Sequence, residues 1–322
     1  MTIPFPIKPM EPITFAEPFD SLEYLFQVKW DGVRCLAYTL ETGTRLFNRK
    51  LNERTRQYPE IVESLDKLPR GIILDGEIIT LGQDMKPNFR RVLKRDLAKN
   101  SMKISQLIER IPVYYMVFDI VYYANKNIAD RPLTQRQEIL EKVLCQNPIV
   151  KAVDSVLYKG VSLFNAVKNE KLEGIIAKRL DGPYIFGEKT SYWRKIKVWQ
   201  ELIAVIGGYS TKMGEIRSLL VGLFNQSDNL LYYIGNASSG VSHNQWLVLQ
   251  QHFERCTDKP VKTPFVNPPR KPRGEEYHWV KPELCLKLEY TEWTEDFRLR
   301  NPKVIDFANQ GDGSSGWFFK NK

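Results

Sequence analysis

The sequence changes character near residue 200, and this change limits what the chain can fold into. From there on, short runs of β-branched, aromatic and aliphatic residues follow one another closely: ELIAVIGGY (201–209), RSLLVGLFN (217–225) and NLLYYIG (229–235). One helix candidate at 245–255 and a strand at 283–291 follow them. Several short strands with one intervening helix are typical of a small β-barrel of the OB type. We therefore predict a boundary at Trp199–Glu201, with domains at 1–199 and 200–322.

The first 199 residues mix strand and helix patterns. Residues 25–40 alternate around KWDG, which predicts a strand, a tight turn and a second strand. Thr134 and Gln137 have the spacing of a capping box for one of the helices. Further strands are expected at 71–81, 113–123, 175–179 and 192–199, and helices at 55–68, 88–99, 134–144 and from Ser162 onward. We therefore expect an α+β protein in which antiparallel sheets with flanking helices precede the barrel.

Composition narrows the classes of function. With 322 residues, of which 43% are hydrophobic, the chain can form two globular domains, and no apolar run approaches the roughly 18 residues of a membrane span. The net charge of +9 favours a polyanionic partner, most commonly nucleic acid. The cysteines lie far apart in sequence, which argues against a CxxC-type metal site and favours a reducing, cytoplasmic compartment; they are Cys35, Cys145, Cys256 and Cys285.

The strongest local feature is KWDGVR at 29–34. A lysine at the end of a strand, beside a glycine turn, is displayed to a site. Lys29 becomes a nucleophile if burial or neighbouring cations depress its pKa. The simpler alternative is an ordinary β-hairpin, because Asp-Gly is a favoured turn pair.

Two further segments place polar or aromatic groups within apolar strands. Alternation puts Asp75 and Glu77 of LDGE (74–77) on one face, where two carboxylates are costly unless they meet a cation or a metal. The alternative is an Asp-Gly turn followed by a solvent-facing glutamate. Phe118, in the run 113–123, could stack on a base, although a phenylalanine there is more often a core residue.

The last two segments carry an acid and three lysines. EGIIAK (173–178) sets Glu173 before a strand, and WRKIKV (193–198) places Lys195 and Lys197 on one strand face. Two lysines on a face can clamp a phosphate. The alternatives are a helix-ending acid and a solvated edge strand protected by lysines.

These five segments, in this order, resemble the covalent nucleotidyltransferase superfamily and, within it, the ATP-dependent DNA ligases. KWDGVR resembles the KxDGxR motif, and the EGxxxK and WxKxK motifs of the family are similar to 173–178 and 193–197. FNR (47–49), LDGE and VFD (117–119) resemble the segments between them. IGGY (206–209) and EYTEWT (289–294) resemble the OB domain of bacterial end-joining ligases, so the resemblance covers nearly the whole chain.

The resemblance implies a role for each matched residue. Lys29 would attack the α-phosphorus of ATP and hold AMP as a phosphoramide. Arg34 and Arg49 would lie near the ribose and phosphates. The remaining roles are stacking on adenine for Phe118, holding the α-phosphate for Lys195 and Lys197, and binding Mg²⁺ or Mn²⁺ or ribose hydroxyls for Glu77 and Glu173.

Two positions depart from the family pattern. A glutamate that accepts a hydrogen bond from the adenine amine commonly lies two residues before the nucleophile, and here that residue is Gln27. Its amide oxygen can still accept, but base discrimination is expected to be looser. Near the C-terminus, Arg298 and Arg300 match the RxP half of the last motif and are candidates for orienting pyrophosphate.

The resemblance also implies partners. The expected substrate is nicked or broken duplex DNA, with a Ku-type end-binding protein as a partner, a monomeric enzyme and a location in the bacterial cytoplasm or nucleoid. The predicted helix 88–99 carries four candidates for contacts to DNA phosphates: Arg90, Arg91, Lys94 and Arg95.

Two alternatives stay open. One is an RNA ligase or a capping-type guanylyltransferase of the same superfamily, which would label Lys29 with GTP in the capping case. The other is a non-catalytic nucleic-acid-binding module that has kept an OB barrel. Covalent labelling by ATP separates it from the enzymes.

Overall fold

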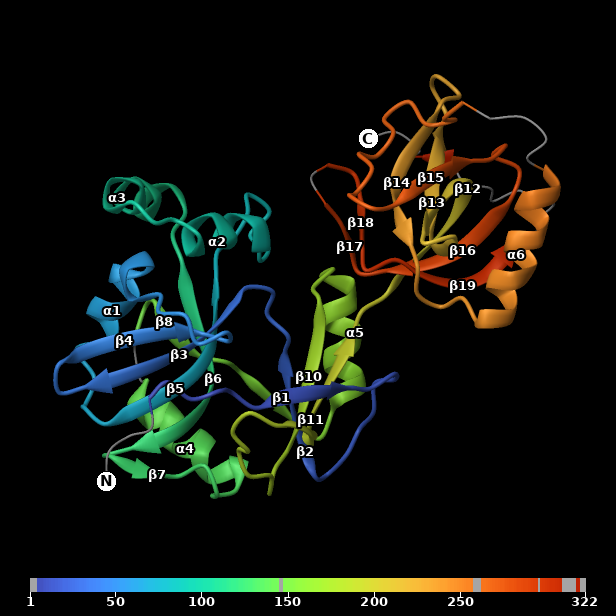
Figure 1. Cartoon of the computed structure of the whole chain (residues 1–322). Coiled ribbons are helices and arrows are strands. Elements are labelled where there is room, and N and C mark those ends of the chain that lie inside the picture. Colours follow the sequence, from blue (N-terminus) through green and yellow to red (C-terminus); the bar gives the residue numbers. More distant parts are fainter. Residues whose placement is uncertain (1–4, 145–146, 257–261, 295, 309–316, 319–322) are drawn as a thin grey trace. The chain divides into compact units, whose positions relative to one another are not determined.

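The computed structural model describes residues 5–144, 147–256, 262–294, 296–308 and 317–318. The chain divides into two compact units, Met1–Val198 and Trp199–Lys322 (Figure 1).

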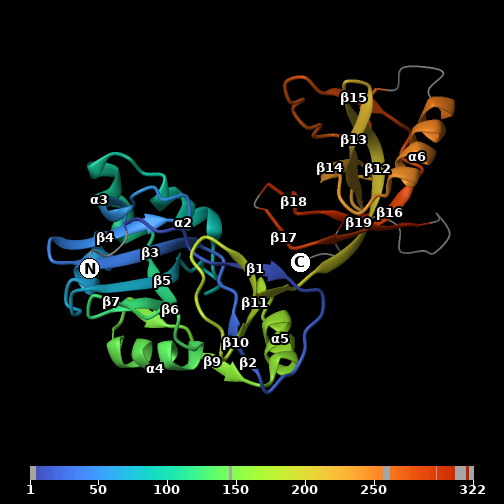
Figure 2. The same cartoon turned by 60° about the horizontal axis from the view of Figure 1, so that its bottom comes forward.

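The first unit contains a five-stranded sheet that carries the predicted nucleophile segment. Its strand order is β1 (Glu11–Thr14), β11 (Lys189–Lys197), β10 (Gly174–Arg179), β2 (Tyr24–Val28) and β9 (Ser155–Leu157). All neighbours are antiparallel except β1 and β11. Helix α5 (Gly160–Asn169) packs on one face, where Ile175, Ile196 and Val167 are buried together. Figure 2 shows α5 beside β2 and β10. The opposite face is therefore left for functional residues.

A second sheet in the same unit carries the remaining predicted site residues. Its order is β4 (Gly43–Asn48), β3 (Val33–Leu40), β5 (Ile72–Ile79), β6 (Tyr114–Tyr123) and β7 (Lys126–Asn127), and β8 (Val150–Ala152) pairs in parallel with β6. Side chains of its helices, including Ile61, Val92 and Leu140, join its main core. The helical elements are η1 (Thr55–Gln57), α1 (Pro59–Leu65), α2 (Phe89–Asp96), α3 (Ser101–Arg110) and α4 (Leu133–Val143).

A separate hydrophobic cluster joins the two sheets. It includes Leu36 and Ile73 of the second sheet and Trp193 of the first, with Phe118 and Ile176 partly buried against it. The two sheets therefore bring their functional residues to one place within the first unit.

The expectation of a hairpin around KWDG is wrong. β2 pairs with β10 and β9, whereas β3 pairs with β4 and β5, so the two strands belong to different sheets. Residues 29–32 therefore cross from one sheet to the other. A Cβ on Gly32 would lie 2.3 Å from the carbonyl oxygen of Ile78. Only glycine allows the chain to cross β5 so closely.

The capping box is also wrong. α4 begins at Leu133 with Pro132 as its N-cap, and no side chain caps it. The side-chain amide of Gln137 donates instead to the carbonyl oxygen of Phe118. Helix α3 is not among the predicted helices, and of its apolar residues only Ile104 is buried.

The second unit is a closed barrel. Its main path is β14 (Leu231–Ala237), β13 (Glu215–Asn225), β12 (Gln200–Lys212), β16 (Cys285–Tyr290) and β19 (Lys303–Ala308). A bridge between Ser239 and Lys303 joins the two ends of the path. Leu249 and Phe253 of α6 (His243–Cys256) enter the core. The shorter strands are β15 (Glu276–Trp279), β17 (Glu292–Trp293), β18 (Leu299–Arg300) and β20 (Trp317–Phe318).

Two of the four cysteines lie in the described part of the chain together with their side chains. Cys35 and Cys285 are buried free thiols, whereas Cys145 and the side chain of Cys256 lie outside the described part. Among the described residues, no helix has the length and apolarity that a membrane crossing requires.

Candidate active site

Lys29 lies just beyond the end of β2, where it meets Glu173. The backbone N–H of Lys29 donates to the carbonyl oxygen of Gly174 at 2.9 Å, and its Nζ forms an ion pair with the Glu173 carboxylate. Lys197 Nζ lies 3.6 Å from the other carboxylate oxygen. A Cβ on Gly174 would lie 2.2 Å from the carbonyl oxygen of Ile196, so glycine is needed where Glu173 enters the sheet. One carboxylate thus holds two lysines from strands far apart in sequence.

The register of the first sheet explains this convergence. Ile176 on β10 lies opposite Gln27 on β2 and opposite Lys195 on β11. Because side chains alternate, Gln27, Lys195 and Lys197 share the face away from α5. Burial, followed by the charges of Lys197, Lys189 and Lys29, lowers the pKa of Lys195. The face therefore concentrates positive charge, as a phosphate site requires.

Arg34 is fixed by a carboxylate of the second sheet. Its Nε and Nη2 donate to the two oxygens of Asp75 at 3.0 and 2.6 Å, and Tyr184 OH donates to Asp75 at 2.6 Å. Asp75 therefore meets the cation that its place in an apolar strand predicted.

Glu77 lies opposite Arg34 across the β3–β5 pair. Burial raises the pKa of the Glu77 carboxyl to about 8. The positive charges of Lys29 and Arg34 oppose this rise, whereas the negative charge of Glu173 adds to it. The negative charge of Glu173 therefore disfavours the ionised form of Glu77, and a divalent cation bound by both carboxylates would relieve this effect. Two carboxylates fit a Mg²⁺-type site, because that ion uses one or two carboxylates together with substrate phosphates.

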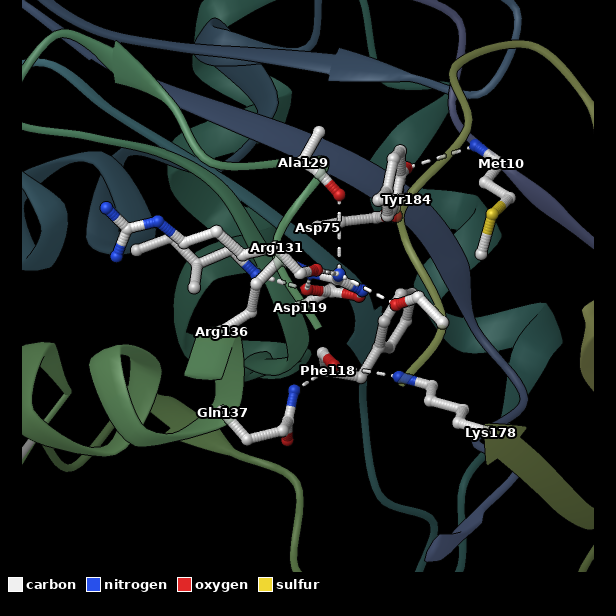
Figure 3. A network of polar contacts seen from close by, with 12 residues as sticks. Met10, Asp75, Phe118, Asp119, Ala129, Arg131, Arg136, Gln137, Lys178 and Tyr184 are labelled. Carbon is white, nitrogen blue, oxygen red and sulfur yellow. Dashed lines mark hydrogen bonds and ion pairs between the residues drawn. The ribbon is translucent and has the colours of Figure 1, made fainter. Parts of the chain in front are cut away.

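Phe118 lies among aromatic and cationic groups from both sheets. Its ring centroid is 5.7 Å from that of Trp193, in an edge-to-face arrangement. Arg34 and the buried Lys178 lie 5.3 and 4.6 Å from its ring centroid. Lys178 Nζ also donates to the carbonyl oxygen of Phe118 at 2.7 Å, as Figure 3 shows. Phe118 is partly buried in the cluster between the sheets and is held by several contacts.

Three contacts around Phe118 and Asp119 were not predicted from the sequence. Arg136 forms a buried two-point ion pair with Asp119 at 2.8 and 2.9 Å (Figure 3). The signal was available, because an aspartate within the apolar run 113–123 needs a cationic partner. Lys178 and Gln137 both donate to the carbonyl oxygen of Phe118, and no pattern in the sequence pairs them with it.

Arg49, Arg298 and Arg300 have other partners in the structure. Arg49 is exposed, and its Nη1 lies 3.9 Å from a carboxylate oxygen of Glu11. In the second unit, Arg298 donates to the carbonyl oxygen of Tyr233 and lies 4.5 Å from that ring, while Arg300 pairs with Glu292.

The four cations of α2 differ in exposure. Arg95 is fully buried, where it pairs with Glu60 and donates to the carbonyl oxygens of Gln57 and Ile111. The expectation that Arg95 contacts DNA is therefore wrong, because its guanidinium links the helices to one another. Arg91 is partly buried and donates to the carbonyl oxygen of Arg110, Arg90 is partly buried, and Lys94 is exposed.

Comparisons with known proteins agree with this geometry. Residues 9–197 match the ATP dependent DNA ligase domain, and residues 212–309 match the ATP dependent DNA ligase C terminal region. The SPbeta prophage-derived DNA ligase-like protein LigB of Bacillus subtilis is 28% identical over 296 residues, which cover 92% of this chain and 97% of that protein. A DNA ligase of Thermococcus fumicolans is 26% identical over 93% of this chain, which spans 55% of that longer protein.

Solved structures give the same result. A mycobacterial DNA ligase D complexed with ATP and MES is 25% identical and has a TM-score of 0.54 over 94% of this chain and 95% of that one. A Lig E DNA ligase is 17% identical, with a TM-score of 0.60 over 92% of this chain and 99% of that one, and shares the fold. The chain therefore belongs to the ATP-dependent DNA ligases, with a nucleotidyltransferase domain followed by an OB-fold domain.

Proposed function

We propose that this protein seals nicks in duplex DNA through AMP carried on Lys29. The observation that carries the proposal is the contact of Lys29 Nζ with Glu173, beside Lys197 and near Lys195. A lysine nucleophile needs a group that takes its proton and a positively charged surface for the phosphate that it attacks. This arrangement supplies both.

In the first step, Lys29 Nζ forms a bond to the α-phosphorus of ATP, and the bond from that phosphorus to the pyrophosphate oxygen breaks. The Lys29 ammonium gives one proton to Glu173, which is in contact with Nζ, before the attack. It releases a second proton to solvent as the bond to phosphorus forms. Lys195 and Lys197 neutralise the charge of the α-phosphate. The chemistry depends mainly on positioning and charge neutralisation.

The later steps transfer AMP and join the strands. An oxygen of the DNA 5′-phosphate attacks the α-phosphorus, and the bond to Lys29 Nζ breaks as the nitrogen regains a proton; a second proton restores the ammonium. The 3′-hydroxyl then attacks the 5′-phosphorus of the DNA adenylate and loses its proton to solvent, AMP leaves and the phosphodiester is complete. Lys29 thus returns to its starting state.

Glu77 and Glu173 would hold Mg²⁺ or Mn²⁺ together with nucleotide phosphates. The ion supplies positive charge that stabilises the phosphoryl transfer. Glu77 keeps its proton more readily than an ordinary carboxyl, so binding of a cation there is expected to release that proton.

We also propose a role in DNA repair and end joining, as a monomer acting with a Ku-type end-binding protein. The resemblance of 206–209 and 289–294 to the OB domain of bacterial end-joining ligases supports this role. The buried free thiols Cys35 and Cys285 favour a reducing, cytoplasmic compartment.

The proposal is tested by sealing of a labelled nicked duplex with ATP and either Mg²⁺ or Mn²⁺. Glu173→Gln should reduce sealing at least about tenfold, because removal of a transition-state charge costs 1.4 kcal/mol or more. Glu170→Gln is the matched control, since Glu170 is exposed three residues earlier. Absence of sealing by the unaltered protein with either metal would contradict the proposal.

A further inference from the structure

The side-chain amide of Gln27 is buried and held by three neighbours. Its Nε2 lies 3.3 Å from Gln137 Oε1, 3.4 Å from the carbonyl oxygen of Val153 and 3.0 Å from Ser155 Oγ. The Ser155 hydroxyl can donate or accept, so it fits either orientation of the amide. The other two contacts decide the orientation.

Two backbone carbonyls, which can only accept, fix both amides. Gln137 must turn its NH₂ group toward the carbonyl oxygen of Phe118, at 3.0 Å, which leaves its Oε1 facing Gln27. Gln27 must then present its NH₂ group both to that oxygen and to the Val153 carbonyl. The reversed amide would set oxygen against oxygen at both contacts.

This orientation leaves one acceptor unused. Gln27 is 1% exposed, and no donor among the described residues reaches its Oε1. An unpaired buried acceptor is costly, so a ligand donor there would be favoured. Gln27 is two residues before Lys29, shares its strand face with Lys195 and is joined through Gln137 to Phe118, so we assign the oxygen to the nucleotide site.

We propose that Gln137 is a positioning residue that holds the Gln27 amide with its oxygen toward the base, so that the site rejects 6-oxopurine nucleotides. The inference rests on the proposed function. A 6-amino group donates to Gln27 Oε1, whereas a 6-oxo group places a second acceptor against it. Gln27 in place of the usual glutamate therefore still discriminates between adenine and 6-oxopurines, because the Gln137 amide fixes the orientation of the Gln27 amide.

A series of three nucleotides tests the lock in the unaltered protein. Covalent labelling of Lys29 is measured as kcat/KM with ATP, with purine riboside triphosphate, which lacks a 6-substituent, and with ITP, which has a 6-oxo group. A locked acceptor predicts the order ATP, then purine riboside triphosphate, then ITP. An amide that rotates freely would use ATP and ITP about equally well, and that result would overturn the inference.

Variants of Gln137 test whether this residue sets the orientation of the Gln27 amide. Gln137→Leu should lower the ATP-to-ITP preference at least about fivefold, the effect of one net hydrogen bond. Lys178 still donates to the Phe118 carbonyl in this variant. Gln137→Glu keeps an acceptor for Gln27 and should retain the preference for ATP, although it loses the NH₂ group that donates to the Phe118 carbonyl oxygen and should therefore lower the melting temperature.

Two controls complete the test. Ser155→Ala removes the shortest contact to Gln27 but should leave the preference unchanged, because the hydroxyl suits both orientations. Gln135→Leu makes the same change at an exposed position of α4. An unchanged preference in Gln137→Leu, or an equal fall in Ser155→Ala, would overturn the inference. Failure of every nucleotide to label the unaltered protein would instead contradict the proposed function.

Discussion

The Nζ of Lys29 and the carboxylate of Glu173 form an ion pair across 144 residues of sequence. The contact exists because β2 and β10 are neighbours, with Glu173 just before β10 and Lys29 just after β2. Lys197, at the end of β11, reaches the same carboxylate. Three strand ends therefore assemble the charged centre.

The Arg34–Asp75 pair should be important for stability. Asp75 is fully buried and the Arg34 side chain is 12% exposed, so Asp75→Ala leaves a buried guanidinium without its carboxylate. We expect a loss of about 3–5 kcal/mol in the free energy of unfolding, measured by chemical denaturation. Glu53→Ala breaks the exposed Arg45–Glu53 pair and should cost about 1 kcal/mol or less. Equal losses in the two variants would refute this distinction.

Lys178 should make stability depend on pH. Burial lowers the pKa of Lys178 to about 7 from its ordinary 10.5. Between these values the unfolded chain binds more protons than the folded one, so this lysine makes stability rise with pH through the window. The difference in unfolding free energy between the unaltered protein and Lys178→Met should therefore shift toward the unaltered protein from pH 7 to pH 9, by at most about 1.4 kcal/mol per pH unit. A constant difference would show that Lys178 stays charged.

DNA affinity should depend on the accessible cations of α2. Arg90→Ala and Lys94→Ala should each weaken binding to nicked duplex and reduce the salt dependence by about one counterion. Lys94 is exposed, so Lys94→Ala should do so without lowering the melting temperature. Arg95→Ala should lower the melting temperature, because Arg95 is buried against Glu60. Lys67→Ala, at an exposed position just after α1, is the control. Binding that does not respond to salt would contradict a phosphate-contact interface.

Arg298 and Arg300 of the second unit should matter more for adenylation by ATP than for sealing of a pre-adenylated nick. Arg298→Ala with Arg300→Ala is expected to impair adenylation by ATP, because the leaving pyrophosphate needs a cation, and to spare sealing of a pre-adenylated nick. Glu292→Ala breaks the pair with Arg300 but keeps the cation, so it should leave adenylation near normal. An equal loss in both steps would assign these arginines to DNA binding or to folding of the barrel.

The alternation of apolar and charged residues predicted which face of β11 carries its lysines. Ile196 and Val198 are buried with α5, and alternation therefore places Lys195 and Lys197 on the other face. The pairing of strands was less accessible, since register depends on contacts between distant segments. Local alternation cannot show that β2 and β3 belong to different sheets, because Asp-Gly is equally suited to a hairpin.

The sequence does not show which cations of α2 are buried and therefore cannot contact DNA. Arg95 has the same local sequence appearance as Lys94, yet one is fully buried and the other exposed. The difference depends on Glu60 and on carbonyl groups of other helices. The spacing of Gln137 from Thr134 predicts a cap, whereas in the structure its amide bridges the Phe118 carbonyl oxygen and Gln27.

The identity of the adenylated residue is the most direct test of the central claim. The protein is incubated with α-labelled ATP and Mg²⁺ or Mn²⁺, and the labelled peptide is identified by mass spectrometry. We predict one AMP on Lys29, no label in Lys29→Ala or Lys29→Arg, and sealing of a pre-adenylated nick that partly survives in Lys29→Ala. Undiminished labelling of Lys29→Ala, or AMP on another residue, would contradict the account.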